Sequence, residues 1–353
     1  MPRNEFDAAD KQILNILQSD FPLVEEPWAE IGRRVGVSSQ EVISRVTDLK
    51  KKNVVRQVGA IFDTRRLGYT STLVAMRFEP LALERGAHIL NRHPGISHNY
   101  EREGYFNLWF TLAVPPGRDI EEELELLARL TGARETRLLP TIRFFKIGVN
   151  FDMVNEVSDA REYYVPDAPS AQNTADALEG WNNAQDLSEL DVAFIKELQE
   201  DLPLEERPFE GMAKRLGMTV KELFDYAGRM VERRLMRRYS AVLHHRRAGF
   251  SANAMIVWNV PDERAQEVGE IMANSPAVTH CYQRPRYPDW KYSHFTMVHA
   301  TTRDTCEEIA RQIEAATGIH DRLLLYSTRE YKKTRVRYFV EEEFRAAEEA
   351  AAR

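Results

Sequence analysis

The 353-residue sequence contains only two cysteines, and this scarcity excludes several classes of protein. Cys281 and Cys306 match no paired metal-ligand or redox spacing, which excludes a disulfide-stapled scaffold and a cysteine-based zinc module. No apolar run approaches the roughly 18–20 residues that span a bilayer, and the N-terminus is too acidic and polar for a signal peptide. We therefore expect a cytoplasmic protein with no membrane partner.

Positive charge is also scarce. The 48 Lys and Arg are outnumbered by 55 Asp and Glu, and the balance is −1 for residues 1–158 and −6 for residues 159–353. Nucleic-acid-binding domains usually carry excess positive charge, so the composition argues against a nucleic-acid partner. With 43% apolar residues, the composition is that of a globular protein, and the length predicts about two or three domains.

The chain contains two diverged copies of one sequence. The offset between matching residues grows from 181 near the N-terminus to 186 near the C-terminus, which indicates loop insertions in the second copy. The matched segments include residues 10–18 (DKQILNILQ) with 191–199 (DVAFIKELQ), 97–102 (SHNYER) with 279–284 (THCYQR), and 138–146 with 324–332.

Each copy reads as a helical module followed by a mixed module. Three short stretches of helical periodicity precede an alternating segment at residues 54–61, which is the pattern of a winged helix-turn-helix. The order strand, helix, strand, strand, helix, strand follows, and this βαββαβ order is ferredoxin-like. The predicted fold class is α+β. In the first copy the expected elements are strands 71–78, 96–101, 107–114 and 141–149 and helices 82–91 and 120–130.

Domain boundaries follow from these patterns. Residues 159–186 lack a steady apolar period and collect Pro, Asn, Ala, Ser and Asp, as a linker does. We expect the two copies to pack sheet against sheet as a pseudo-dimer within one chain, and leave open whether two chains form a homodimer. The expected domains are winged helices at 1–68 and 187–249, ferredoxin-like domains at 69–158 and 250–340, the linker at 159–186, and a C-terminal helical tail at 341–353.

A winged helix joined to a βαββαβ domain resembles the Lrp/AsnC family of amino-acid-responsive transcription regulators. Two features argue against a regulator. Fusion of two unequal halves breaks the symmetric dimer expected on a palindromic operator. The recognition helix of the second copy places Glu222, Phe224 and Asp225 where contacts to bases and phosphates need amides and cations.

Further motifs resemble the siroheme decarboxylases, and the fusion of unequal halves is similar to their NirDL form. Both copies insert Asp-x-Pro-Leu…Pro-aromatic between the first two helices, beginning at Asp20 and Asp201. The other motifs that carry the resemblance are residues 97–102, 107–111, 237–250, 279–284, 292–299 and 327–333.

The resemblance implies a carboxy-lyase. Its reaction removes the acetate carboxylates on rings C and D (positions 12 and 18) of siroheme without oxygen and gives didecarboxysiroheme, for heme synthesis or for the modified heme of nitrite reductases. The alternatives are an Lrp/AsnC-type DNA-binding regulator and a non-catalytic heme sensor.

Siroheme is a flat macrocycle ringed with carboxylates, so its site needs cations, an apolar wall and a proton donor. Histidine has the pKa nearest neutrality, and guanidinium groups bind carboxylates in bidentate fashion. The candidate catalytic residues are His245 and His280, with His299 in reserve; the tandem His244-His245 leaves open which of the two acts. The candidate substrate-binding residues are Arg237, Arg238, Arg246, Arg284, Tyr282, Trp290 and Tyr292, with His98 and Arg102 as degenerate first-copy counterparts.

Alternation along the expected strands groups these candidates. A strand at residues 279–283 puts His280 and Tyr282 on one face with Arg284, and on the strand 292–299, His299 faces away from His294.

No additional cofactor is expected. The conjugated ring can stabilise the carbanion-like centre left by carbon dioxide, and the siroheme substrate carries its own iron. The sequence contains no Gly-x-Gly-x-x-Gly, Walker loop, Cys-x-x-Cys-His or zinc-spaced ligand cluster, so we expect no metal site. The expected partner is an iron tetrapyrrole, and binding of heme stays open.

Overall fold

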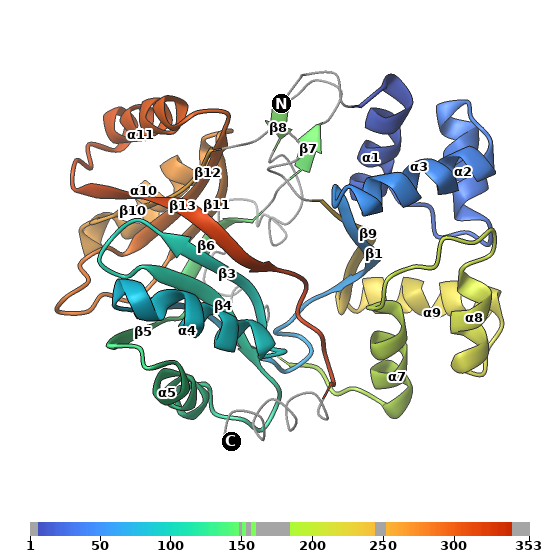
Figure 1. Ribbon diagram of the computed structural model, residues 1–353, viewed down its shortest axis with the longest axis horizontal. Coiled ribbons are helices and arrows are strands. Elements are labelled where there is room, and N and C mark those ends of the chain that lie inside the picture. Colours follow the sequence, from blue (N-terminus) through green and yellow to red (C-terminus); the bar gives the residue numbers. More distant parts are fainter. Residues whose placement is uncertain (1–5, 148–149, 153–156, 160–183, 244–251, 341–353) are drawn as a thin grey trace. The chain divides into compact units, whose positions relative to one another are not determined.

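The computed structural model describes residues 6–147, 150–152, 157–159, 184–243 and 252–340. These residues belong to two compact units (Figure 1). The helical unit comprises residues 1–67, 150–159 and 185–250, and the sheet unit comprises residues 68–149, 160–184 and 251–353. Most of the expected linker and the expected C-terminal helix lie outside the described residues.

The helical unit contains one three-helix module from each copy. Asp7 and Ser38 cap two of the first-copy helices, since their side chains accept hydrogen bonds from the N–H groups of Asp10 and Glu41. The first copy supplies α1 (Ala8–Ser19), α2 (Pro27–Val35) and α3 (Ser39–Lys51), followed by β1 (Val55–Phe62). The second supplies α7 (Glu189–Leu198), α8 (Phe209–Arg215) and α9 (Val220–Glu232), followed by β9 (Met236–Leu243).

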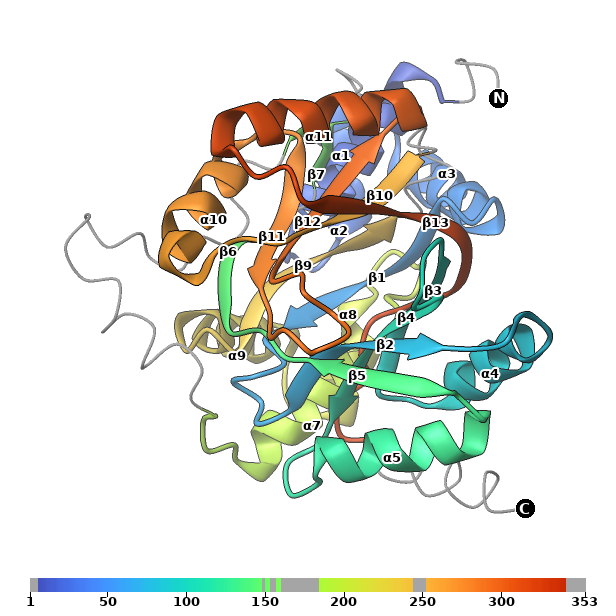
Figure 2. The same ribbon diagram turned by 90° about the vertical axis from the view of Figure 1, so that its left-hand side faces the viewer.

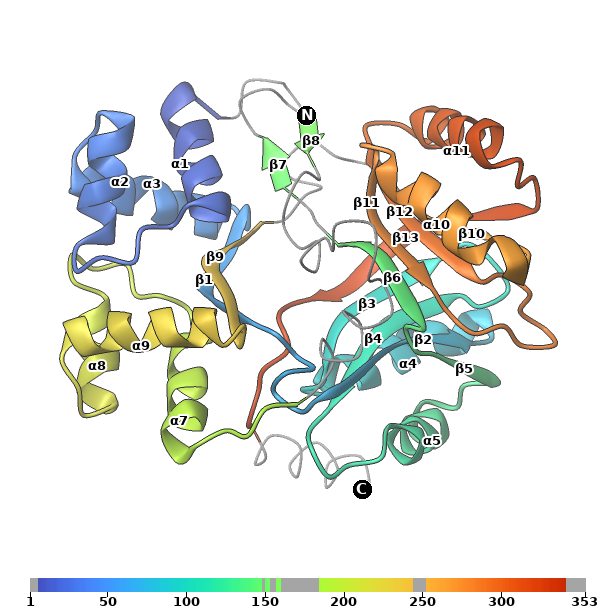
Figure 3. The ribbon, with the colours of Figure 1, turned by 180° about the vertical axis from the view of Figure 1, so that it is seen from behind.

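Strand β1 pairs antiparallel with β9, its counterpart from the other copy (Figure 3). The strand that the sequence predicted as the wing of the first copy therefore pairs with the equivalent strand of the second copy. Trp28 and Phe209 are the aromatic residues of the two Pro-aromatic motifs. Both are fully buried and belong to the hydrophobic cores of their modules. A short pair, β7 (Asn150–Asp152) and β8 (Val157–Asp159), completes the unit.

The sheet unit contains both ferredoxin-like modules, and each has the strand order 4-1-3-2 of that fold. These elements confirm the predicted fold class. The first module comprises β2 (Thr70–Arg77), α4 (Pro80–Arg92), β3 (Ile96–Arg102), β4 (Leu108–Val114), α5 (Ile120–Thr131), β5 (Glu135–Leu139) and β6 (Arg143–Ile147). The second comprises β10 (Ala252–Trp258), η1 (Asp262–Arg264), α10 (Ala265–Asn274), β11 (Val278–Gln283), β12 (His294–Ala300), α11 (Arg303–Thr317) and β13 (Arg322–Lys333).

One prediction about these strands was wrong. Residues 141–149 were expected to form the fourth strand of the first module, but β5 takes that place and pairs with β2. Pro140 separates β5 from β6, because a proline has no N–H to donate to a ladder. After this break, β6 pairs with β11 of the second copy.

The two modules form one nine-stranded sheet in the order β5-β2-β4-β3-β13-β10-β12-β11-β6. The first half of β13 pairs with β10 and its second half with β3 of the other copy. Only residues 140–142 separate the two edge strands, so the edges lie at most about 14 Å apart along the chain. The sheet therefore curls back on itself and has an inner and an outer face (Figure 2).

Among the described residues, the helices that cover the outer face are α4, α5, α10 and α11. Helices α4 and α5 pack on first-copy strands, and α10 and α11 on second-copy strands. The two modules interlock here, because Phe145 on β6 lies directly on α10 at Gly269, where a Cβ atom would collide with the ring. Among the described helices, none is long and apolar enough to cross a membrane.

Candidate functional site

The inner face carries the same three side chains in each copy. His98, Tyr100 and Arg102 alternate along β3, and His280, Tyr282 and Arg284 alternate along and just beyond β11. The ring centroids of the histidine and tyrosine are 6.3 Å apart in the first copy and 6.1 Å apart in the second, with the rings nearly parallel. The guanidinium carbon lies 5.3 Å and 4.8 Å from the respective tyrosine ring centroid. Alternation thus predicted the shared face of the second set correctly.

Both arginines join the two copies. Arg102 Nη1 of the first copy donates to the Leu325 carbonyl of the second at 3.1 Å. Arg284 of the second copy donates in return to the Leu139 carbonyl of the first. Both arginine side chains are buried, and a hydrogen bond from a buried cation to a carbonyl stabilises more than a neutral one. The arginines therefore fix the junction where the inner faces meet.

His299 lies beside His280. Met297 is the register partner of His280, and His299 follows it by two residues on the same face of β12. Asn253 on β10 lies opposite His299 in the next ladder. His280 Nδ1 is 3.1 Å from Thr279 Oγ1, which fixes the orientation of that ring.

Burial is the main influence on both imidazoles. It lowers the pKa of His280 to about 4, and the positive charges of Lys333, Lys146 and Arg284 act in the same direction. Burial likewise lowers the pKa of His299 to about 3, with further contributions from His280, Lys333 and Arg102. Both rings are therefore neutral at pH 7. Each nevertheless keeps part of its surface accessible.

The two halves of the inner face are unequal. Thr111 is the register partner of His98, so Ala113 occupies the position that His299 occupies in the second copy. Ser71 faces Ala113, where the second copy has Asn253. The second-copy half is therefore the one in which two histidines lie together.

An apolar core lies further along the inner face. Trp109 and Trp290 are buried with ring centroids 5.4 Å apart, and Tyr292 packs on Trp290 at 5.1 Å. The predicted substrate-binding residues Trp290 and Tyr292 thus belong to this core, and contact between them and a macrocycle stays a prediction.

The remaining predicted residues lie elsewhere. Arg237 binds Asp63 at 2.8 Å within the helical unit, and Arg238 lies on the same strand opposite Ile61. His244, His245 and Arg246 fall outside the described residues. The roles predicted for these residues stay predictions.

Two other histidines are structural. His93 Nε2 lies 2.9 Å from Glu123 Oε1, and its Nδ1 accepts the Gly95 N–H. His294 Nε2 lies 2.9 Å from the Ala265 carbonyl on the outer face. Both rings are buried and bridge parts of the fold.

Sequence reasoning missed Lys333. This residue ends β13 with His98 as its register partner, and its charge acts on both His280 and His299. The internal repeat could have identified it. Lys332 matches Lys146, but the next residue is lysine in the second copy and isoleucine in the first, so Lys333 is a charge that only one copy has at this position.

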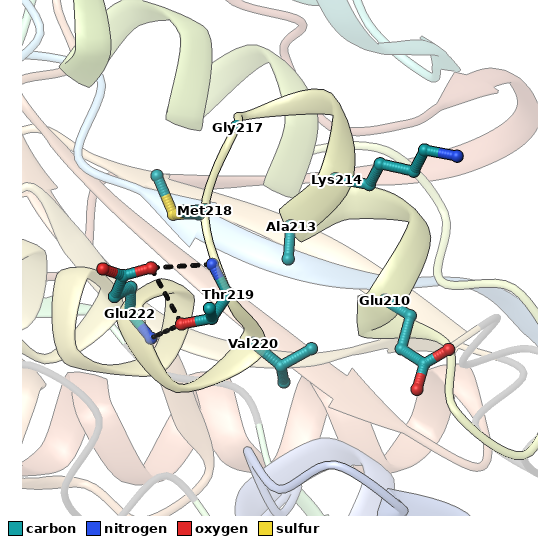
Figure 4. A pocket seen from close by; sticks show the side chains of 8 residues that line it. All are labelled: Glu210, Ala213, Lys214, Gly217, Met218, Thr219, Val220 and Glu222. Atoms are coloured by element: carbon teal, nitrogen blue, oxygen red, sulfur yellow. Dashed lines mark hydrogen bonds between the residues drawn. The ribbon is translucent and has the colours of Figure 1, made fainter.

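A surface depression of about 450 Å³ lies in the second helix-turn-helix, between α8 and α9 (Figure 4). Thr219 and Glu222 form a capping box on its wall. None of the predicted site residues lines it, so the inner face of the sheet is the stronger candidate. The lining residues are Glu210, Ala213, Lys214, Gly217, Met218, Thr219, Val220 and Glu222.

Comparison with known families matches both kinds of module. The profile described as an AsnC-like ligand binding domain matches residues 66–146 and 247–332. The profile described as a siroheme decarboxylase NirDL-like HTH domain matches residues 10–56 and 191–237.

Individual proteins match over the whole chain or over one copy. The siroheme decarboxylase of Hydrogenobacter thermophilus is 39% identical over 96% of this chain and 96% of its own. The siroheme decarboxylase beta subunit of Methanosarcina barkeri is 48% identical over 43% of this chain and 99% of its own. The crystal structure of the siroheme decarboxylase NirDL in co-complex with an iron-uroporphyrin III analogue superposes with a TM-score of 0.69 and 32% identity, covering 98% of both chains.

Proposed function

The chain belongs to the siroheme decarboxylase family, in the fused form of NirDL, and from this membership we propose how its residues carry out the reaction. It is a carboxy-lyase that decarboxylates siroheme. The observation that carries this conclusion is the 39% identity to a siroheme decarboxylase over 96% of the chain.

The reaction breaks two carbon–carbon bonds. The acetate carboxylates on rings C and D leave as carbon dioxide, and each bonding electron pair stays on the carbon that remains. A proton then adds to that carbon, so no external oxidant is consumed. The conjugated macrocycle delocalises the developing negative charge. The protein has to hold the ring, limit access of water and deliver protons.

His280 and His299 are suited to deliver a proton at the inner face. Both imidazoles are neutral in the free protein, because burial and nearby cations lower their pKa values to about 4 and about 3. Substrate carboxylates bring negative charge next to those cations, and this charge raises the imidazole pKa. Protonation of the pair is thus coupled to substrate binding.

We retain His245 as a further proton donor, for the second acetate, with His244 as the alternative. His98, Arg102, Tyr282 and Arg284 form the wall on which the ring and its carboxylates would lie. The remaining proposed contacts are those of Arg237, Arg238, Arg246, Trp290 and Tyr292.

The iron tetrapyrrole is the substrate in this proposal, and no other cofactor is required. The co-complex of NirDL with an iron-uroporphyrin III analogue supports an iron tetrapyrrole as ligand. Within the sheet unit, the ladders β13–β3 and β11–β6 join the two modules, as expected of an intramolecular pseudo-dimer. Association of two chains stays a prediction. We place the reaction in the cytoplasm, where the free thiols Cys281 and Cys306 would stay reduced.

The comparisons support decarboxylation and not the regulator. The helical unit gives a physical reason as well. Arg45 lies on α3, the third helix of the first helix-turn-helix, and binds the carboxylates of Asp7, Asp10 and Glu41 at 2.7–2.9 Å. These three acids offset the charge that a phosphate contact needs.

The decisive test is anaerobic incubation of the purified protein with siroheme, followed by mass spectrometry. We expect loss of two units of carbon dioxide from the tetrapyrrole. Tight binding without a change of mass would instead favour the heme sensor, and absence of both would contradict the proposal.

A further inference from the structure

Lys332 and Lys333 end β13, and the two neighbouring lysines face opposite sides of the sheet. Lys332 Nζ donates to the carbonyls of Asn91 at 2.9 Å and His93 at 3.0 Å, at the C-terminal end of α4 on the outer face. Because side chains alternate along a strand, Lys333 faces inward, where His98 is its register partner.

The outer lysine has a counterpart in the first copy, but the inner lysine has none. Lys146 Nζ donates to the carbonyl of Ser275, the C-cap of α10, at 2.9 Å. Lys146 thus makes the same kind of bond as Lys332. The residue after Lys146 is Ile147, the register partner of His280. Of these two equivalent inner positions, one therefore carries a lysine and the other an isoleucine.

The positive charge of Lys333 lowers the pKa of both His280 and His299. Among the charged groups that lower the pKa of His280, Lys333 is the strongest, ahead of Lys146 and Arg284. It also lowers the pKa of His299, after burial and His280. Lys333 is half-buried, and a carboxylate brought next to a partly buried cation interacts with it more strongly than it would in bulk water.

We propose that Lys333 binds a propionate of siroheme, a carboxylate that is kept throughout the reaction, and so positions the macrocycle with a reacting acetate toward His280 and His299. This inference rests on the proposed function. The carboxylate must be a retained one, because a cation on the leaving carboxylate would stabilise the ground state and slow its loss. Rings C and D each carry a propionate beside the acetate, which supplies such a group.

Lys333 would also favour one of the two orientations in which the substrate can bind. A sheet with two-fold pseudo-symmetry offers a flat macrocycle two related orientations. Lys333 lies opposite His98, where the equivalent Ile147 lies opposite His280. His299 takes the place in the second-copy half that Ala113 has in the first. An orientation that brings a carboxylate to Lys333 therefore differs from its two-fold relative in both the ion pair and the second imidazole. Lys333 is therefore a positioning residue that selects which side of the substrate meets the histidines.

The test compares Lys333→Met with Lys332→Met in the full-length protein. Iron uroporphyrin III is titrated optically into each variant, because this ligand has all eight carboxylates. We expect Lys333→Met to raise Kd about ten-fold or more, as loss of one charge-assisted contact does, and Lys333→Arg to restore most of the affinity. Lys332→Met should lower Tm but leave Kd within about two-fold.

Iron coproporphyrin III identifies which carboxylate is bound, because it keeps the propionates and lacks the acetates. The Lys333→Met penalty should be the same for both ligands. An unchanged Kd in Lys333→Met, or a penalty confined to iron uroporphyrin III, would overturn the proposal.

Kinetics with siroheme separate positioning from mere stability. Lys333→Met should raise KM and leave kcat at its optimum within about three-fold, because the contact persists in the product. The kcat/KM profile of the variant should move to higher pH, since His280 and His299 lose a neighbouring positive charge in the free enzyme. A profile unchanged by the substitution would contradict the proposal. Wild-type turnover in the same assay tests the proposed function separately.

Discussion

His299 lies one step along the β11–β12 ladder from His280 on the same inner face, and Ala113 holds the equivalent place beside His98. The two copies have thus diverged where proton transfer would occur. Replacement of the second-copy histidines should therefore cost more activity than replacement of the first-copy one.

We expect His280→Ala and His299→Ala each to lower kcat about 100-fold or more, as is typical for loss of a general acid. His98→Ala should affect KM more than kcat. The control is His88→Ala, because His88 is exposed on α4 and lies outside the site. The measurement is anaerobic turnover of siroheme. Parental rates for His280→Ala and His245→Ala together would refute these catalytic assignments.

Stability should fall as the solution becomes acidic. The folded-state pKa values of His280 and His299 lie below their ordinary value of 6.5, at about 4 and about 3, so the unfolded chain binds more protons over this range. The contribution of these rings is complete above about pH 6.5 and is lost as pH falls through the folded pKa values. Urea unfolding between pH 7.5 and pH 5 measures the effect.

His299→Ala should make that pH dependence shallower, since it removes one of the buried groups. A variant as acid-sensitive as the parent would show that the ring is already solvated in the folded state.

The guanidinium bonds between the copies should stabilise the sheet unit. Arg284→Ala removes the bond to the Leu139 carbonyl and should lower the free energy of unfolding by about 1.5–3 kcal/mol. The comparison variant is Arg311→Ala, whose partner Glu308 is exposed on the same helix. Its loss should change the free energy of unfolding far less, because exposed ion pairs contribute little. Equal losses in the two variants would mean that the junction does not depend on Arg284.

The helical unit should not bind DNA. In fluorescence anisotropy with mixed-sequence duplexes at low salt, we expect no binding at micromolar protein concentrations, where non-specific DNA-binding proteins already associate. Binding that weakened steeply with added salt would show that the ion pairs of Arg45 do not suppress phosphate contacts.

Local patterns predicted much of the fold. The internal repeat identified two copies, and alternation placed His280, Tyr282 and Arg284 on one face. The strand pairings between the copies could not be predicted from the sequence, because periodicity shows which face of a strand is buried but not which strand lies beside it. For this reason β5 was missed and the pairing of β1 with β9 was not foreseen.

The site was predicted less completely for the same reason. Histidines and arginines could be nominated by their chemistry, but Lys333 becomes a candidate only when β13 is known to cross to β3. Trp290 looked suited to stack on a macrocycle, yet the same large apolar surface also suits it to the inner core, and composition cannot separate these roles.

The exchange of strands has a consequence for how the halves stay together. Strand β6 leaves the first copy to pair with the second, and β13 crosses in the opposite direction. Each half thus supplies part of the other's sheet, so a chain cut between the copies would yield two fragments that still need each other to complete their ladders. Because the two halves are joined in one chain, they are always present in a one-to-one ratio. The ladders between the copies then fix the register of their strands.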